Sequence, residues 1–109
     1  MKLNNEYKKI SIEVRRQLLE ISNSAKSSHL GSSLSIVDLL VVLYKKILKK
    51  NIFILSKGHA CIAQYCVLNK FKYISNKVIK SYGKNNTILL SHVSHKVPGV
   101  DFSTGSLGY

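Results

Sequence analysis

The feature that most constrains the fold of this chain of 109 residues is a four-residue apolar run, Ile52 to Leu55. The run is too short for a helix, and it is too apolar for a strand with one face in solvent. It therefore predicts a buried strand of a parallel sheet. The chain turns polar directly afterwards, in Ser56 to His59, and helix-forming residues follow from Ala60. A buried strand, a tight turn and a helix in this order favour an α/β fold.

Helices are predicted before this strand. Apolar residues recur at helical spacing from Glu6 to Ala25, and a second apolar segment extends from Ile36 to Leu48. Ser35 stands three residues before Asp38, a pattern that resembles a capping box, so we expect the second helix to begin there. The small polar residues 24–33 between the two helices predict a loop.

The second half of the chain predicts two further helices and one more strand. One helix follows the Gly-His pair at residue 59. Ser75 is placed to cap another that ends at Tyr82, with Gly83 as its left-handed terminator. Residues 88–90 indicate a short strand, and the glycine-rich and serine-rich residues 91–109 indicate a loop.

Composition excludes some classes of function. The net charge is +12, but only Arg15 and Arg16 of the 17 basic residues are arginines, and the lysines are spread along the chain. Arginine provides bidentate recognition of phosphate and bases, so we expect solvated surface lysines and no nucleic-acid partner. No apolar run reaches the roughly 18 residues that cross a membrane, and no signal peptide is recognisable, so a cytoplasmic protein is expected. Cys61 and Cys66 lack metal-ligand spacing and are expected to be small core residues.

Three of the four histidines stand beside small residues in a predicted loop or at a predicted helix start: His29, His59 and His92. The fourth, His95, shares the loop of His92. An imidazole near the exposed N–H groups of a helix start, where glycine permits close approach, is a common way to hold phosphate. His59 fits this arrangement because it follows a predicted strand and opens a predicted helix. Taken singly, each histidine is also compatible with an ordinary loop residue.

Three ordered segments carry a resemblance to a known family: SSHLGSSLSIVDLLVVLY, FILSKGHACIAQYCVL and LSHVSHKVPGVDFSTGSLG. Their order and separation resemble the N-terminal thiamine-diphosphate-binding domain of transketolases, above all the form divided into N-terminal and C-terminal subunits. The resemblance extends from about Arg15 to Gly108. It implies that residues 1–109 are the N-terminal part of this domain. The implied fold is a partial thiamine-diphosphate-binding fold, a parallel sheet flanked by helices and truncated at its C-terminal end.

The resemblance also implies a role for individual residues. His29 corresponds to a histidine that contacts the sugar near its reacting carbon, and His59 to one that lies against the cofactor diphosphate. His92 corresponds to a histidine that faces both cofactor and substrate. Gly105 and Leu107 correspond to positions whose backbone meets the aminopyrimidine ring. His29 and His92 are thus the implied catalytic residues, and the other three, with His92, bind the cofactor.

The implied activity is reversible transfer of a two-carbon ketol unit between phosphorylated sugars, as in the pentose phosphate pathway of carbohydrate metabolism. The family's Mg²⁺ ligands, a Gly-Asp-Gly segment and a later asparagine, do not occur in these residues, so no metal ligand is predicted here. We therefore expect the isolated chain to bind thiamine diphosphate weakly or not at all, and to be inactive. The implied partner is a C-terminal transketolase subunit or domain, in a homodimer or heterotetramer.

The sequence departs from the family around the histidines. Ser28 and Ser91 replace glycines, Val93 replaces a proline, and Tyr109 stands where glutamine is usual. Three alternatives stay open from the sequence: a related thiamine-diphosphate enzyme such as deoxyxylulose-phosphate synthase, a noncatalytic fragment that binds a partner chain, and a nucleic-acid module.

Overall fold

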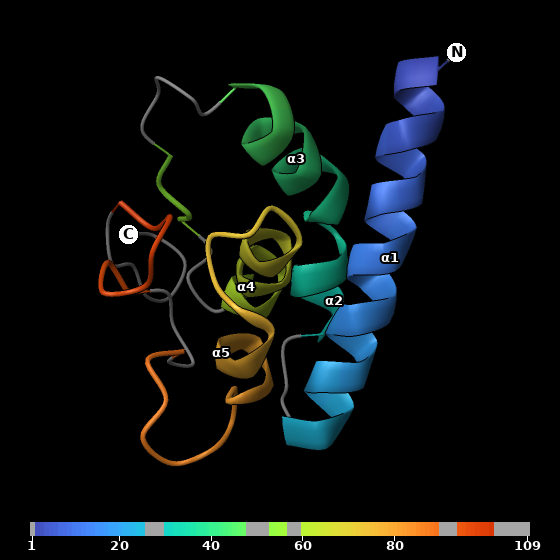
Figure 1. The fold of residues 1–109 in the computed structure, drawn as a ribbon. Helices are drawn as coiled ribbons and strands as arrows, with labels where there is room; N and C mark the ends of the chain where they lie inside the picture. Colours follow the sequence, from blue (N-terminus) through green and yellow to red (C-terminus); the bar gives the residue numbers. More distant parts are fainter. Residues whose placement is uncertain (1, 26–29, 48–52, 57–59, 90–93, 102–109) are drawn as a thin grey trace.

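The computed structural model describes residues 2–25, 30–47, 53–56, 60–89 and 94–101. The regular structure of these residues is helical, and Figure 1 shows it arranged around one central helix. The elements in chain order are α1 (Lys2–Ala25), α2 (Leu30–Leu34), α3 (Val37–Val42), the π-helical turn η1 (Leu43–Ile47), α4 (Cys61–Lys70) and α5 (Asn76–Lys80). In Figure 1, α1 lies on one side of α4, and the loops that follow α5 lie on the opposite side.

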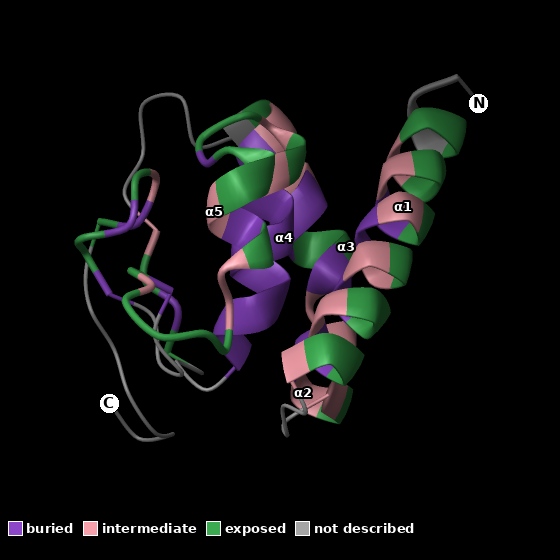
Figure 2. Ribbon diagram, turned by 60° about the horizontal axis from the view of Figure 1, so that its bottom comes forward, coloured by how far each residue is buried: buried purple, intermediate pink, exposed green. Residues whose placement is uncertain are grey.

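The long helix α1 confirms the helix predicted from periodicity. Its buried residues are Ser11, Val14, Leu18 and Ser22, which recur every three or four positions and so form one face. This face packs against α3 and α4. Figure 2 shows the buried positions of α1 turned toward the other helices, with exposed positions on the outer side.

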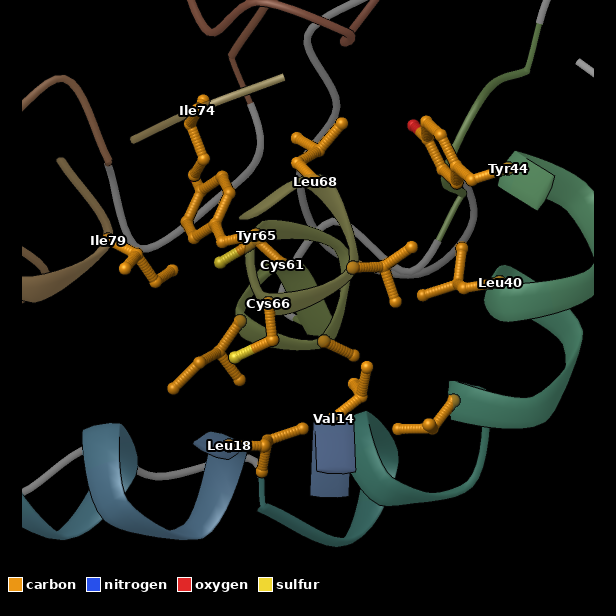
Figure 3. Close-up of a cluster of buried hydrophobic side chains, with 14 of the residues drawn as sticks. Val14, Leu18, Leu40, Tyr44, Cys61, Tyr65, Cys66, Leu68, Ile74 and Ile79 are labelled. Carbon is orange, nitrogen blue, oxygen red and sulfur yellow. The ribbon is translucent and has the colours of Figure 1, made fainter. Parts of the chain in front are cut away.

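The helix α4 forms the centre of the molecule. Every residue from Cys61 to Leu68 is buried, so this part of the helix has no solvent face (Figure 2). A helix that is buried all round is the expected outcome for a segment without a polar stripe. Figure 3 looks along α4 and shows core side chains around it from α1, α3 and the region of Ile74 and Ile79. The two cysteines form no disulfide and are fully buried, which confirms their prediction as small core residues.

The region between α1 and α3 differs from its prediction. Residues 24–25 still belong to α1, and residues 30–33 belong to α2, so the predicted loop is wrong at both ends. The predicted capping box is also wrong, because α3 has Ile36 at its N-cap and no side-chain cap. Ser35 Oγ instead donates to the carbonyl oxygen of Ser32 at 2.9 Å. Asp38 accepts a 2.9 Å hydrogen bond from Arg15 of α1, a charge-assisted contact that competes with capping.

The start and end of α5 agree better with the sequence. Ser75 Oγ accepts a hydrogen bond from the Val78 N–H at 3.2 Å, so the predicted cap is confirmed. The helix ends at Lys80, before the predicted Tyr82, and Gly83 follows with a φ of +80°. The left-handed conformation predicted for this glycine is therefore present.

The prediction of an α/β fold with a parallel sheet is wrong, because the described residues contain no strand. The N–H of Phe53, in the segment predicted as the first strand, donates to Asp101 Oδ2 at 3.3 Å. Leu89, in the second predicted strand, donates its N–H to Thr87 Oγ1 at 3.0 Å. In a sheet, these N–H groups would donate hydrogen bonds to carbonyl oxygens of a neighbouring strand, but here side-chain oxygens accept the hydrogen bonds. The first segment is also buried on one side only, because Leu55 is buried and Ile54 is 55% exposed.

The length and composition of the helices also indicate whether any of them could cross a membrane. Within the described residues, no helix combines the length and the apolar character required to cross a bilayer.

Candidate functional site

The residues predicted to form the site all lie outside the part of the chain that the structure describes: His29, His59, His92, Gly105 and Leu107. Their roles stay predictions. The structure does describe the elements to which they are joined along the chain.

Short pieces of chain connect the predicted residues to described elements. His29 directly precedes α2, and His59 directly precedes Ala60, the N-cap of α4. His92 stands two residues before the described loop 94–101, and Gly105 stands four residues after it. Helix α2 packs against α4, and Val97 and Val100 of the loop belong to the same buried core as α4. The flanking elements therefore share one packing partner, the helix that begins after His59.

A buried tyrosine links three of these elements. Gln64 of α4 donates a hydrogen bond from Nε2 to the Tyr44 hydroxyl oxygen at 2.6 Å. The Tyr44 hydroxyl donates in turn to the carbonyl oxygen of Gly99, in loop 94–101, at 3.0 Å. Burial raises the pKa of Tyr44 to about 12, so its hydroxyl keeps the proton that it donates. The loop is thus tied to α4 through a side chain of η1.

Two aromatic rings pack against the ring of Tyr44. The ring of Tyr44 meets those of Phe53 and Tyr73 edge to face, with centroid separations of 6.2 Å and 5.8 Å. Figure 3 shows Tyr44 beside α4, with its hydroxyl on the side of Leu68. Gly99 has a φ of +90°, and a Cβ at this position would lie 2.4 Å from Leu68 Cδ2. The backbone of the loop at Gly99 therefore lies so close to the core that only glycine, which has no Cβ, fits there.

Two buried polar atoms lack a hydrogen-bond partner among the described residues. They are Ser33 Oγ in α2 and Gln64 Oε1 in α4. An unpaired buried polar atom costs about 1–3 kcal/mol, so native proteins contain few of them. Ser33 stands four residues after His29, and Gln64 stands five residues after His59. Each atom thus lies on the helix that follows a predicted ligand-binding histidine, and each is a polar group suited to a bound polar ligand.

Three of the described carboxylates are engaged in ion pairs. Glu6 pairs with Lys45 at 2.6 Å, Asp38 pairs with Arg15, and Glu13 pairs with Lys70. The hydrogen bond from Arg15 holds the pKa of Asp38 below its usual value. No group of three or more histidine, cysteine or acidic side chains forms a metal site within the described residues. These residues therefore do not fit Mg²⁺, which requires several oxygen ligands.

Comparison with known proteins assigns the family. The family profile described as "Transketolase, thiamine diphosphate binding domain" matches residues 7–109. The chain therefore belongs to this family, as its sequence resemblance predicted.

Similar curated proteins include subunits of divided transketolases. An apulose-4-phosphate transketolase subunit of Phocaeicola vulgatus is 35% identical over 105 residues, which cover 87% of this chain and 37% of that protein. The subunit of the same name from Actinobacillus succinogenes is 33% identical, over 96% of this chain and 42% of that protein. The 6-deoxy-6-sulfo-D-fructose transketolase subunit SqwG of Clostridium sp. is 31% identical, over 87% and 38%. The chain spans about two fifths of the length of these relatives.

Sequence reasoning missed the roles of Tyr44 and Gln64. Gln64 did carry a signal, because it is the only amide in the apolar stretch from Ala60 to Leu68. A lone amide in a buried helix requires a hydrogen-bond partner. Tyr44 ends an apolar run and has no feature in the sequence that distinguishes it from other core aromatic residues.

Proposed function

We propose that these residues are the N-terminal part of the thiamine-diphosphate-binding domain of a transketolase. The complete protein transfers a two-carbon ketol unit between phosphorylated sugars. The observation that carries this proposal is the family match over residues 7–109. The relatives named as transketolase subunits support it further.

Thiamine diphosphate is the proposed cofactor, and it supplies the reactive carbon that carries the two-carbon unit. In this proposal His59 holds the diphosphate, and the backbone at Gly105 and Leu107 contacts the aminopyrimidine ring. His92 faces both cofactor and sugar, and His29 contacts the sugar. The unpaired polar atoms on α2 and α4 support a polar ligand beside these helices. In this proposal the Mg²⁺ ligands come from other sequence, because the family's Gly-Asp-Gly segment does not occur in these 109 residues.

The partner in this proposal is a C-terminal transketolase subunit or domain. Two observations support an assembly with further sequence. The relatives are named as separate transketolase subunits, and this chain spans only about two fifths of their length. We place the complete assembly, a homodimer or heterotetramer, in the cytoplasm and in the metabolism of phosphorylated sugars. The 109 residues alone are inactive in this proposal.

The test compares the isolated chain with the complete protein, defined as these residues together with the downstream sequence and the partner subunit. Each sample receives a phosphorylated ketose, a phosphorylated aldose, Mg²⁺ and thiamine diphosphate. We expect two-carbon transfer from the complete protein only, and a loss of cofactor binding in its His59→Ala variant.

The outcomes separate the alternatives. A rate with pyruvate as donor, and none with a ketose, would instead assign a related synthase. Association with the partner subunit, without cofactor binding or turnover, would assign a noncatalytic role.

A further inference from the structure

We propose that a groove between α1 and the ends of α4 and α5, here called the α1–α5 groove, binds an extended acidic segment of a partner protein. This inference goes beyond the proposed function and does not depend on it. Every residue that carries it belongs to the described part of the chain, and none is a predicted ligand of the cofactor or the sugar.

Three depressions of the surface join to form the groove. The first lies between the C-terminal end of α1 and the turn after α5, the second between α1 and the end of α4, and the third beside the chain from α4 to α5. Gln17 and Glu20 line both the first and the second, while Asn69 and Lys70 line both the second and the third. The groove is therefore continuous. Along α1 it follows residues 13–25, a rise of about 18 Å, which about five or six residues of an extended peptide would span.

The charge of the groove selects an anionic occupant. Glu13 pairs with Lys70, so Glu20 is the carboxylate of the groove that forms no ion pair with a described residue. Its two carboxylates are outnumbered by its five cationic side chains, which are Arg16, Lys70, Lys72, Lys80 and Lys84. An acidic segment is complementary to these cations. A second copy of this chain, with its net charge of +12, would be repelled.

Side-chain amides at the centre of the groove suit a peptide backbone. Gln17 Nε2 donates to Asn69 Oδ1 at 2.9 Å, and Asn69 Nδ2 donates to Asn76 Oδ1 at 3.0 Å. This row of amides crosses from α1 through α4 to α5. At its two ends, Gln17 Oε1 and Asn76 Nδ2 make no hydrogen bond to a described residue. One is an acceptor and the other a donor, so they match the N–H and C=O groups of an extended backbone.

A nucleic acid fits the groove less well than an acidic peptide. Arg16 is the single arginine among the described residues that line the groove, and lysine does not bind phosphate in a bidentate manner. Single strands also stack their bases on aromatic rings, but the ring of Tyr82 already lies against that of Tyr65, with centroids 5.8 Å apart. Glu20 lies where the first two depressions meet, and its carboxylate would repel an unbroken row of phosphates. A peptide can place acidic residues beside the lysines and neutral residues beside Glu20.

The test measures binding of a fluorescein-labelled peptide, DDSGSSDD, to the full-length chain, which comprises these residues and the downstream sequence. Fluorescence anisotropy at physiological ionic strength gives the dissociation constant. The peptide SSDDDDGS has the same composition but places its aspartates in the middle, toward Glu20. We expect it to bind about fivefold more weakly, and Glu20→Gln should remove this difference.

Two pairs of lysine substitutions separate the groove from the overall charge. Lys80→Gln together with Lys84→Gln should raise the dissociation constant of DDSGSSDD about fivefold to twentyfold, because each exposed charge pair contributes about twofold to fivefold. The matched control is Lys8→Gln together with Lys9→Gln. These lysines are exposed on α1 and do not line the groove, so the same loss of two charges should change the dissociation constant less than about twofold.

Asn76→Asp separates binding from stability. The aspartate keeps an oxygen that accepts from Asn69, and a carboxylate in the first turn of α5 favours the helix, so resistance to urea should not fall. The same change removes the amide donor and adds a negative charge to the groove. The dissociation constant of the peptide should therefore rise about fivefold.

Each outcome decides the proposal. Binding of DDSGSSDD that the groove variants weaken selectively supports it. Absence of binding overturns it, and so do equal effects of the two lysine pairs or an unchanged affinity in Asn76→Asp. Tighter binding of a single-stranded oligonucleotide, weakened by the Lys80 and Lys84 substitutions, would also overturn it and assign the groove to nucleic acid. None of these measurements requires thiamine diphosphate, so failure here leaves the proposed function intact.

Discussion

Replacement of Gly99 by alanine tests the packing of loop 94–101 more directly than any other single change. The φ of +90° at this position is one that residues with a Cβ rarely adopt. An added Cβ would lie 2.4 Å from Leu68 Cδ2 and 3.0 Å from Tyr73 Cδ1. Leu68 is fully buried on α4, so its side chain has little room to move away. The backbone conformation and the contact both oppose the methyl group.

The two penalties add to a measurable loss of stability. The unfavourable φ costs about 1 kcal/mol and insertion of a methyl group into a packed site costs about 1–3 kcal/mol. Gly99→Ala should therefore lower the free energy of unfolding by about 2–4 kcal/mol. Urea unfolding followed by helical circular dichroism, with linear extrapolation to water, measures this difference.

Gly31→Ala is the matched control. Gly31 lies in α2, and no heavy atom lies within 4 Å of a Cβ built on it. The same chemical change should here stabilise the fold by about 0.5–1 kcal/mol, because alanine favours a helix over glycine. The two variants should thus differ in sign. If Gly99→Ala were as stable as Gly31→Ala, the described approach of the loop to Leu68 would be wrong.

Three further changes test separate features. Ser75→Ala should lower the free energy of unfolding by about 1 kcal/mol, because Ser75 caps α5. Ser35→Ala should lower it by less, because Ser35 caps no helix. Equal losses in urea unfolding would contradict these assignments. Burial raises the pKa of the Cys66 thiol from 9.0 to about 12, so above pH 9 only the unfolded thiol ionises. Between about pH 9 and pH 11, the free energy of unfolding of the unsubstituted chain should therefore fall more steeply than that of Cys66→Ala, by about 1.4 kcal/mol per pH unit. If the two free energies changed in parallel with pH, the thiol would not be buried. Asp38→Asn should cost less than about 1 kcal/mol at neutral pH, because its contact with Arg15 is largely exposed; a larger loss would show that this pair supports the core.

Local signals in the sequence predicted those features that depend on few distant contacts. The apolar period that places Val14 and Leu18 on one face identified α1, and Ser75 correctly marked the start of α5, whereas this helix ends at Lys80, before the predicted Tyr82. The period follows from helix geometry and the cap from one side chain, so neither needs knowledge of the rest of the fold.

Features decided by tertiary contacts could not be read from the sequence. Asp38 resembled part of a capping box, but its partner is Arg15, 23 residues earlier in the chain. The apolar run that ends at Leu55 resembled a buried strand, because periodicity does not reveal whether a neighbouring strand is present. Glycine and serine in residues 31–33 suggested a loop, yet this segment is helical and packs against α4. Packing overrode local preference in that segment.

The features of the candidate site likewise divide into those that the sequence predicts and those that it does not. Motif order identified the family and the predicted histidines, and neither requires coordinates. The connection from Gln64 through Tyr44 to Gly99 joins residues 20 and 55 positions apart, and no local pattern relates them.

The burial of α4 on all sides has a consequence for how this domain diverges. A helix with an outer face can accumulate neutral substitutions there, as the exposed positions of α1 allow. The segment from Cys61 to Leu68 offers no such position, because every residue in it is buried and a change in volume at any of them meets packed neighbours. Descendants of this chain should therefore change in α4 through paired replacements, each accompanied by a compensating one in α1, α3 or the loop that contacts it.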